Sequence, residues 1–539
     1  MNKLKNILIT LLLGCTVFLN AQTPSASIFS EQKLTDTLNI GYQIKITPET
    51  NSYSIAGVNE SALDKSPFID ISKSLYGKIA GLNVYQGTGS SADNISRLTI
   101  HGKNPLILID GFPRSISDIT STEIESVYIL KDAAASALYG TRGANGVVFI
   151  STKRGANDKL KVKMEYNFGI NTQFRSPEFA DAYTYAQSLN AALQGDGLAL
   201  RYNPQELDAF QTNIYPFGYP NVNWWNQTLN NTGYSHNLKM SFNGGNDRFR
   251  YFTVIDYYRD RSMLKKNTED VRFNTEPTDT RASLRANIDV DITESTFLKT
   301  GIVGKLQELN GTRYGRNNIF TPIYNTPSAA FPIRQQNGIY GGNSVYGANN
   351  PVALLKDYGH TRNMYGTLLA DLSLRQELDA ILKGLGAEVL FSFDNIGGIR
   401  ENSVKEYRYS DADARITEDG TLVTTPKIYG RDSETLGHSQ PFQSLMVSND
   451  IQAKMDYNRS FDKHNVSGAL IYQMQSVTQQ GRNNSRKNQS FLANATYIYD
   501  QRYILNAVFN RSGSSYLPDG DKYANYPAIS AAWAISNES

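Results

Sequence analysis

Residues 139–148 read Tyr139-Gly140-Thr141-Arg142-Gly143-Ala144-Asn145-Gly146-Val147-Val148. A helix-like segment over 132–138 precedes this glycine-rich turn, and a β-branched strand that ends in Lys153-Arg154-Gly155 follows it. The glycine spacing differs from the dinucleotide-binding fingerprint, and the turn leads into a strand rather than a helix. Glycine permits tight backbone geometry at such a turn. The pattern therefore predicts a structural motif. In it, Arg142 would form its contacts either inside the domain that contains the motif or with the wall of the domain that follows it in the chain.

Short elements surround this motif between residues 68 and 155. Apolar runs separated by Gly81, Gly102, Gly111 and Gly140 are typical of mixed α/β structure. The sequence predicts a helix over 70–80 and strands over 82–85, 97–101, 106–110, 127–130 and 147–152.

A different pattern begins after Arg154. Residues 161–170 and 281–290 alternate strictly between polar and apolar side chains. Such alternation places the two kinds on opposite faces of a strand, and in a membrane barrel the apolar face meets lipid. We count roughly twelve strands of this kind. The other ten lie at about 236–244, 248–258, 296–308, 363–378, 386–396, 443–458, 463–475, 487–500, 502–511 and 526–536.

The connections between these strands alternate in length. Short turns lie at 245–247, 293–295, about 379–385, 460–462 and 501. Longer loops lie at about 174–234, 259–279, 309–362, 397–440, 476–486 and 512–525. Outer-membrane barrels have short periplasmic turns and longer extracellular loops, whereas a secreted, soluble β-rich binding protein has no reason to sort them. We therefore expect an α/β domain followed by an antiparallel transmembrane β-barrel.

Composition limits the classes of function. The chain has 539 residues, with 53 Lys and Arg against 51 Asp and Glu, so no charge excess favours a nucleic-acid partner. Its 33 Tyr and 23 Phe suit strands and membrane-interface girdles. Residues 1–21 are typical of a signal peptide. The one cysteine, Cys15, lies in that segment, so we expect an exported mature chain without thiol chemistry.

Catalytic and metal-binding signatures are missing from the sequence. It contains no Gly-x-Ser-x-Gly elbow, no His-Glu-x-x-His and no phosphate-binding Gly-Lys-Ser/Thr loop, and its five histidines are dispersed. Acidic residues between 411 and 419 are typical of a solvated loop. We expect no enzyme activity, no cofactor and no metal.

Nearly the whole mature sequence, from about Asp36 onward, resembles the SusC/RagA family of TonB-linked outer-membrane proteins. The resemblance rests on the order and spacing of several segments. They are Asp36 to Tyr42, Ile79-Ala80-Gly81-Leu82, Leu108-Ile109-Asp110-Gly111, the motif at 139–148, Asn350-Pro351-Val352-Ala353-Leu354, Asn510 to Ser515, and Tyr526-Pro527 to Trp533.

The resemblance implies a domain plan. Residues 1–21 are the signal peptide, 22–63 a periplasmic segment, 64–155 the plug domain and 156–539 the N-terminal part of the barrel. The TonB box would be Asp36, Thr37, Leu38, Asn39, Ile40, Gly41 and Tyr42. The structural plug motif would comprise Tyr139, Gly140, Arg142, Gly143, Ala144, Asn145 and Gly146. Family barrels have 22 strands, so we expect the N-terminal part of a longer receptor.

The resemblance also implies active uptake of an oligosaccharide or a peptide across the outer membrane of a Gram-negative cell. TonB, with ExbB and ExbD, would supply the energy, and a SusD-like surface lipoprotein would cover the barrel. Aromatic side chains in the long loops are candidate substrate contacts, namely Trp224, Trp225, Tyr314 and Tyr340. Two alternatives stay open: a siderophore or cobalamin receptor, and a truncated binding protein that does not transport.

Overall fold

The computed structural model describes residues 38–42, 44–47, 51–63, 70–87, 96–266, 270–315, 318–417, 419–480 and 484–538. All of them belong to one compact unit, Thr37–Ser539. The predicted signal peptide and the first two residues of the predicted TonB box, Asp36 and Thr37, lie outside the described residues.

The plug domain is built on a sheet of five strands in the order β3-β8-β9-β6-β7. These are β3 (Ile55–Asn59), β8 (Ile124–Leu130), β9 (Val147–Thr152), β6 (Leu106–Ile109) and β7 (Phe112–Pro113). β6 and β9 are parallel, and the other neighbours are antiparallel. β9 is apolar and almost wholly buried, as expected of a central strand that is covered on both faces.

Short elements complete the plug domain. They are β1 (Leu38–Asn39) paired with β2 (Lys45–Ile46), β4 (Leu82–Tyr85) paired with β5 (Arg97–Ile100), the helices α2 (Glu60–Leu63), α3 (Ile71–Ser74) and α4 (Ala133–Ala137), and the 3-10 turns η2 (Ile116–Asp118), η3 (Ser121–Glu123) and η4 (Gly140–Gly143). The Asp132 side chain caps α4 by accepting from the Ala135 N–H at 2.7 Å.

Two expectations for this domain need correction. The helix predicted over 70–80 ends at Ser74, and Gly77, at φ +68°, adopts a left-handed conformation that a continuing helix excludes. The plug sheet also begins before the expected boundary at residue 64, because β3 pairs with β8. The sequence of β3, Ile-Ala-Gly-Val-Asn, is too short and has too little polar–apolar alternation to predict a strand by itself.

A second sheet has twelve strands, each paired antiparallel with its neighbour in chain order, which confirms the predicted fold class. We call it the long sheet. Its strands are β10 (Lys161–Thr172), β11 (Thr232–Gly245), β12 (Phe249–Arg261), β13 (Thr278–Asp291), β14 (Thr296–Thr312), β16 (Gly359–Glu377), β17 (Leu385–Val404), β22 (Gly437–Phe461), β23 (His464–Gln479), β24 (Ser485–Tyr499), β25 (Tyr503–Ser514) and β26 (Tyr523–Trp533).

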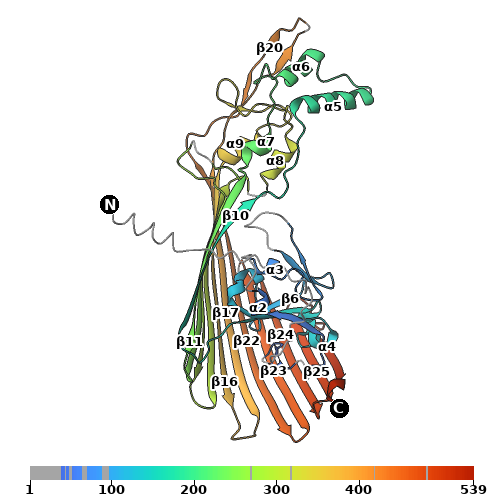
Figure 1. Ribbon diagram of the computed structural model, residues 1–539, viewed down its shortest axis with the longest axis vertical. Helices are drawn as coiled ribbons and strands as arrows, with labels where there is room; N and C mark the ends of the chain where they lie inside the picture. Colours follow the sequence, from blue (N-terminus) through green and yellow to red (C-terminus); the bar gives the residue numbers. More distant parts are fainter. Residues whose placement is uncertain are drawn as a thin grey trace, which may run out of the picture. The chain divides into compact units, whose positions relative to one another are not determined.

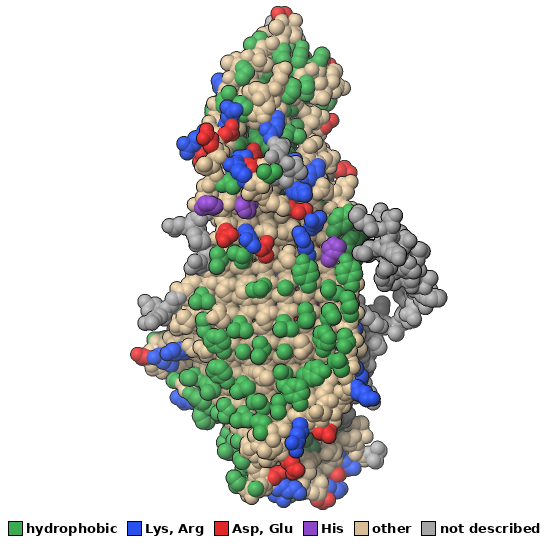
Figure 2. All heavy atoms as spheres, turned by 90° about the vertical axis from the view of Figure 1, so that its left-hand side faces the viewer, with side chains coloured by type: hydrophobic (Ala, Val, Ile, Leu, Met, Phe, Trp, Pro, Cys, Tyr) green, Lys and Arg blue, Asp and Glu red, His purple; other side chains and the backbone are tan. Residues whose placement is uncertain are grey.

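The two faces of the long sheet differ as the alternation predicts. On β13, Leu284 points outward and is 48% exposed, whereas its neighbour Arg285 points inward and is 1% exposed. Apolar side chains gather across the middle of the outer face, with charged side chains above and below them (Figure 2). Polar side chains fill the inner face, where Asp256, Asn287 and Gln473 are buried. This pattern is the reverse of a water-soluble sheet and suits a wall between lipid and a polar interior.

The plug domain packs against the inner face of the long sheet. Figure 1 shows α2, α3, β6 and α4 beside strands β17 to β25. One buried apolar cluster joins the two parts, since Leu138 and Phe149 of the plug pack with Ile471, Leu492 and Val508 of the long sheet. Where it faces the plug, we refer to the long sheet as the wall. Short turns join β11–β12, β13–β14, β16–β17, β22–β23 and β24–β25 at what we call the turn end, and longer connections join the strands at the loop end.

The long connections carry structure of their own. They contain the helices α5 (Ala182–Gly195), α6 (Pro204–Thr212), α7 (Trp224–Thr228), α8 (Phe320–Asn325) and α9 (Pro351–Lys356), and the short strands β15 (Tyr340–Gly341), β18 (Tyr409–Asp411), β19 (Ala414–Ile416), β20 (Leu422–Thr424) and β21 (Lys427–Tyr429). Two buried clusters, one around Trp224 and Leu354 and the other around Ala186 and Phe210, hold these elements together. Among the described helices, none is both long enough and apolar enough to cross a membrane.

Candidate functional site

The described part of the predicted TonB box, residues 38–42, forms a tight hairpin with residues 44–46 against the plug. We call it the box hairpin. The Ile40 N–H donates to the Ile44 carbonyl at 3.0 Å, and the Ile44 N–H donates to the Gly41 carbonyl at 2.9 Å. Gly41 has φ +102° and Tyr42 has φ +50°. Glycine adopts this left-handed region without the steric penalty that a Cβ brings. Ile40 and Tyr42 are both buried, so the hairpin is docked rather than free.

Tyr139 of the plug motif holds the hairpin. Its hydroxyl donates to the Ile40 carbonyl at 2.7 Å, and its ring stacks on the Tyr42 ring with 5.2 Å between centroids. A Cβ on Gly41 would overlap the Tyr139 hydroxyl and would lie 2.8 Å from Tyr139 Cζ. The plug motif therefore recognises the backbone of the box segment at a point where only glycine fits.

Arg142 ties the plug motif to the wall, as one of its two predicted roles required. Gln473 Oε1 on β23 accepts from Tyr42 Oη at 2.8 Å and from Arg142 Nη2 at 2.6 Å. Arg142 Nη1 donates to Gln475 Oε1 at 2.9 Å, and Gln473 Nε2 donates to Asp450 Oδ2 at 2.8 Å. One amide of the wall thus joins the box hairpin to the glycine-rich motif.

Two glycines of the motif, Gly140 and Gly146, fit this arrangement sterically. Gly140 has φ +53°, and a Cβ there would overlap the Ser512 hydroxyl of β25. Gly146 has φ +83°, and a Cβ there would lie 3.1 Å from two Ile100 carbons and from the Leu130 carbonyl oxygen. The glycines therefore let the motif approach the barrel wall and its own sheet.

The buried tyrosines predict that the N-terminal segment detaches at high pH. Burial raises the pKa of Tyr42, and likewise of Tyr53, from about 10 to about 12. Because the pKa is higher in the docked state, docking keeps its full contribution below pH 10 and loses it between about pH 10 and 12. A spin label on Asn39→Cys should become mobile in that window. A variant with both Tyr42→Phe and Tyr53→Phe should lack the transition, and an unchanged transition there would contradict the assignment.

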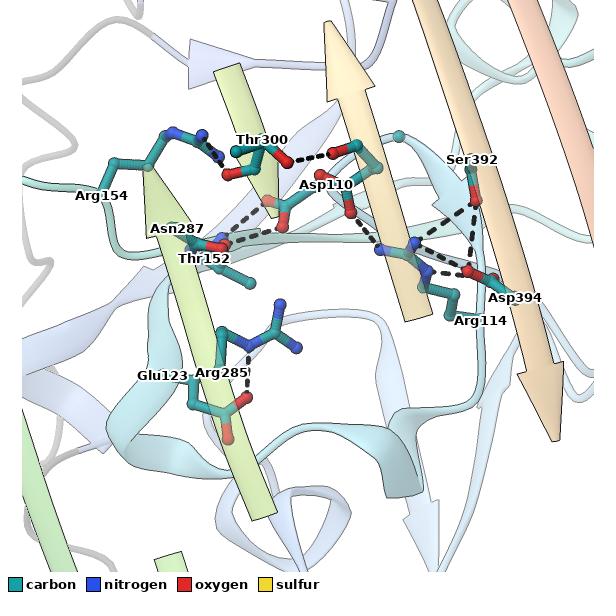
Figure 3. Close-up of polar contacts among 12 residues, drawn as sticks. Asp110, Arg114, Glu123, Thr152, Arg154, Arg285, Asn287, Thr300, Ser392 and Asp394 are labelled. Atoms are coloured by element: carbon teal, nitrogen blue, oxygen red, sulfur yellow. Dashed lines mark hydrogen bonds and ion pairs between the residues drawn. The ribbon is translucent and has the colours of Figure 1, made fainter. Parts of the chain in front are cut away.

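Buried ion pairs fix the body of the plug to the wall (Figure 3). Arg114, which follows β7, donates to both carboxylate oxygens of Asp394 on β17, at 3.1 and 2.9 Å. It also pairs with Asp371 on β16 at 2.8 Å. The side chains of Arg114, Asp394 and Asp371 are 1%, 5% and 13% exposed. Such a bidentate, charge-assisted contact sets position as well as strength.

Three further pairs connect the plug to β13 and β14. Arg285 on β13 donates to Glu123 of η3 at 2.7 Å, and here the wall supplies the cation. Arg154 pairs with Asp289 at 2.6 Å, and Lys305 pairs with Asp118 at 2.6 Å. A neutral contact adds to them, since Asn287 Nδ2 of the wall donates to Thr152 Oγ1 of the plug at 2.8 Å. Thr152 is itself oriented by donating to Asp110 within the plug at 2.7 Å. The plug is therefore held by charges of both signs from both partners.

The sequence missed these ion pairs, although part of the signal was present. Arg285 and Asp289 occupy polar positions of the segment 281–290, so the alternation places them on the inner face. Their partners Glu123 and Arg154 lie far away in the chain, in segments without periodicity. A pairing between such segments depends on how the plug sits against the wall.

Two of the four aromatic candidates are buried packing residues. Trp224 is 3% exposed, packs against Phe331 with the ring planes tilted by 59°, and donates from Nε1 to the Pro327 carbonyl at 3.2 Å. Tyr340 is 4% exposed and packs on Tyr407. These two expectations need correction, because neither ring faces solvent. Tyr314 is half-buried beside Tyr358.

Trp225 differs from its neighbour Trp224. It is half-buried, its Nε1 donates to Gln173 Oε1 at 3.0 Å, and its ring lies near Phe179 and Tyr324. It lines a cavity of about 910 Å³ at the loop end. Side-chain amides surround that cavity, supplied by Gln173, Asn223, Asn226, Asn230 and Asn231. Among the residues that the structure describes, no group of three or more His, Cys, Asp or Glu side chains could hold a metal ion.

Comparison with known proteins confirms the predicted kind of protein. Residues 47–147 match the TonB-dependent Receptor Plug Domain family. TonB-dependent receptor P3 of Formosa agariphila is 24% identical over 94% of this chain and 49% of its own length. TonB-dependent receptor SusC of Bacteroides thetaiotaomicron is 22% identical over 94% of this chain and 51% of its own length. The chain thus spans about half the length of the curated relatives it matches.

Solved structures agree at the level of the fold. The RagAB peptide importer in the open-open state gives a TM-score of 0.70 at 17% identity, covering 92% of this chain and 58% of that one. The siderophore receptor PirA from Acinetobacter baumannii gives a TM-score of 0.52 at 12% identity, covering 91% of this chain and 60% of that one. The matched proteins are receptors and transporters by name.

Proposed function

We propose that this chain, which carries the plug domain and barrel strands of a TonB-dependent receptor of the SusC/RagA type, takes part in active import of a nutrient across the outer membrane. The nutrient is an oligosaccharide or a peptide, and TonB, with ExbB and ExbD, supplies the energy. A SusD-like surface lipoprotein covers the loop end. The observation that carries the proposal is the box hairpin, which is docked on Tyr139 and Gln473.

The position of the hairpin supports a role on the periplasmic side. Ile44, which closes the hairpin, lines a cavity of about 520 Å³ together with Arg375, Glu377 and Asp456, at the turn ends of β16 and β22. Short turns mark the periplasmic end of an outer-membrane barrel. A partner in the periplasm would reach this segment without passing the plug. TonB would then add to it as an extended strand, through main-chain hydrogen bonds.

The buried ion pairs between plug and wall are the contacts that a pulling force from TonB would have to break. The outer membrane has no ATP supply, whereas the inner-membrane potential is worth about 2.3 kcal/mol per charge per 100 mV. Tension on residues 38–42 passes to Tyr139 and from there to the sheet that carries Arg114 and Glu123. Polar contacts, unlike a continuous apolar interface, can be exchanged for water when the plug moves. We infer that the plug opens by exchanging these contacts.

The cavity beside Trp225 supports an oligosaccharide among the two nutrient classes. Sugars present apolar faces to aromatic rings and hydroxyl groups to amides. Here one half-buried indole is fixed in place by Gln173, and four asparagine side chains border the same cavity. Trp225→Ala should weaken oligosaccharide binding, with Trp224 left intact to preserve the loop core.

Cross-linking to TonB tests the proposal. We expect a photo-cross-linker on Asn39→Cys, in outer membranes with bound substrate, to capture TonB. The substitution Leu38→Pro should reduce both the cross-link and uptake at least tenfold, to the level of cells without TonB, because proline removes a donor from the strand. The matched control is a cross-linker on Asn157→Cys, an exposed residue at the junction of plug and wall. Uptake of labelled oligosaccharides and peptides that is equal with and without TonB would refute the proposal.

A further inference from the structure

A cavity of about 530 Å³ lies between the plug and the wall, on the loop side of the Arg142 contact. Its wall residues Gln475 and Gln479 come from the loop-end half of β23, and Arg486 and Asn488 come from the loop-end half of β24. The plug supplies Arg142 to the same cavity. A ligand that enters from the loop side therefore reaches the plug motif here.

The charges in this cavity are unevenly matched. Arg114 is held by Asp371 and Asp394, and Asp118 is held by Lys305. The two remaining guanidinium groups, Arg142 and Arg486, form no direct ion pair with a carboxylate among the residues that the structure describes. The carboxylate that interacts with Arg142, Asp450, is joined to it through Gln473.

Among the described residues, the hydrogen bonds of these two guanidinium groups go to neutral acceptors. Arg142 donates to the amide oxygens of Gln473 and Gln475, at 2.6 and 2.9 Å. Arg486 donates to Asn488 at 3.3 Å and lies over the Tyr516 ring at 5.3 Å. Guanidinium groups bind carboxylates bidentately and more strongly than they bind amides.

The same Arg142 contacts lead to the box hairpin. Gln473 Oε1 accepts from Arg142 on its cavity side and from Tyr42 on its hairpin side. Gln473 is itself oriented by its bond to Asp450, at 2.8 Å. If Arg142 turns to another acceptor, Gln473 loses one of the two donors that fix its amide oxygen. The contact that holds Tyr42 then weakens, although neither Gln473 nor Tyr42 lines the cavity.

We propose that the cavity binds the carboxylate of an acidic ligand through Arg142 and Arg486, and that this binding frees Tyr42 by drawing Arg142 away from Gln473. The inference rests on the proposed import function and adds to it the charge of the ligand and the route of the signal. A carboxylate of this kind could belong to a uronic-acid oligosaccharide or to an acidic peptide. Both offer the fork geometry that a guanidinium matches.

Binding measurements on the purified receptor complex separate these sources. The probes are a galacturonate tetramer with its methyl ester, and a tetra-aspartate peptide with its tetra-asparagine counterpart. We expect one acid to bind at least tenfold more tightly than its neutral counterpart. Arg142→Gln should abolish that preference and Arg142→Lys should keep part of it. The matched control is Lys487→Gln, which removes a positive charge next to Arg486 but outside the cavity lining.

Maleimide labelling of Asn39→Cys reports the signal, because the mature chain has no other cysteine. The preferred acid should accelerate labelling several-fold, and Arg142→Gln should remove that acceleration. Tyr42→Phe should raise basal labelling and, because coupling between two sites is reciprocal, should also raise the affinity for the acid, which a purely structural role of Arg142 would not produce. Equal binding of acid and neutral probes, or acceleration that survives Arg142→Gln, would overturn the inference. TonB-dependent uptake of neutral ligands alone would overturn only the inference, whereas loss of all TonB dependence would overturn the proposed function.

Discussion

Replacing Arg114 with methionine is expected to make opening of the plug from the wall easier by about 3–5 kcal/mol. Arg114 is the central cation of a buried cluster, with one carboxylate partner on β16 and another on β17. Methionine has a similar length but no charge, so Asp371 and Asp394 would stay buried without a counterion. Leaving a buried charge uncompensated costs more than the lost hydrogen bonds themselves.

Hydrogen exchange of the plug backbone measures this effect. The amides of β6 and β9 should exchange roughly a hundred to a few thousand times faster in Arg114→Met, if exchange follows opening of the plug. Arg97→Met is the matched control, because Arg97 lies in the same domain but is exposed, and among the described side chains it bonds to Asn104. It should change exchange little, since exposed polar contacts contribute under about 1 kcal/mol.

A compensating variant separates charge from packing. Asp371→Asn and Asp394→Asn, added to Arg114→Met, remove the two stranded carboxylates and should restore much of the protection. The prediction would be contradicted if the triple variant exchanged as fast as the single one. In that case the cost would come from the lost shape of the guanidinium rather than from unpaired charge.

The effect of Arg114→Met should fall mainly on the body of the plug rather than on the box hairpin. Four sets of ion pairs, around Arg114, Arg154, Arg285 and Lys305, join the plug to four neighbouring strands of the wall, β13, β14, β16 and β17. The box hairpin, by contrast, contacts the plug motif and β23. The ion pairs that hold the body of the plug therefore lie on other strands than the contacts that dock the box, and Arg114→Met should weaken the first more than the second.

The long sheet could be predicted from sequence because its rule is local. Alternation at 281–290 gives the strand, and parity gives the face, so the inward placement of Arg285 and Asp289 follows without any knowledge of the plug. The plug obeys no such rule. The strand β3 has five residues and no clear period, and a left-handed glycine at position 77 stops the predicted helix early. Its sheet is specified by contacts that are distant in the chain.

The candidate site shows the same division. The candidate box, Arg142 and the glycines were predicted from their order along the chain, yet their contacts through Gln473 were not, because this glutamine is one polar residue among many on β23. Trp224 and Trp225 are neighbours in a helical turn, and their side chains point in different directions. Only the packing around α7 decides which indole is buried, so sequence alone could not choose between them.

Gly41→Ala is expected to have the largest effect on the box hairpin. The new methyl group would occupy the position of the Tyr139 hydroxyl, and Gly41 lies at φ +102°, where alanine is strained by about 1–2 kcal/mol before any clash. Since the overlap is with a buried ring that stacks on Tyr42, the hairpin cannot shift by a few tenths of an ångström to relieve it. Docking should be lost altogether.

Limited digestion with chymotrypsin reports that loss, because cleavage after Tyr42 requires a residue that is now 6% exposed to become free. We expect rapid cleavage there in Gly41→Ala and slow cleavage in the unaltered chain. Gly77→Ala is the matched control, since Gly77 has φ +68° but open space around its Cβ position. That variant carries the backbone strain without the clash. Equal cleavage after Tyr42 in the two variants would mean that strain in the plug, and not the fit of Gly41 against Tyr139, governs release.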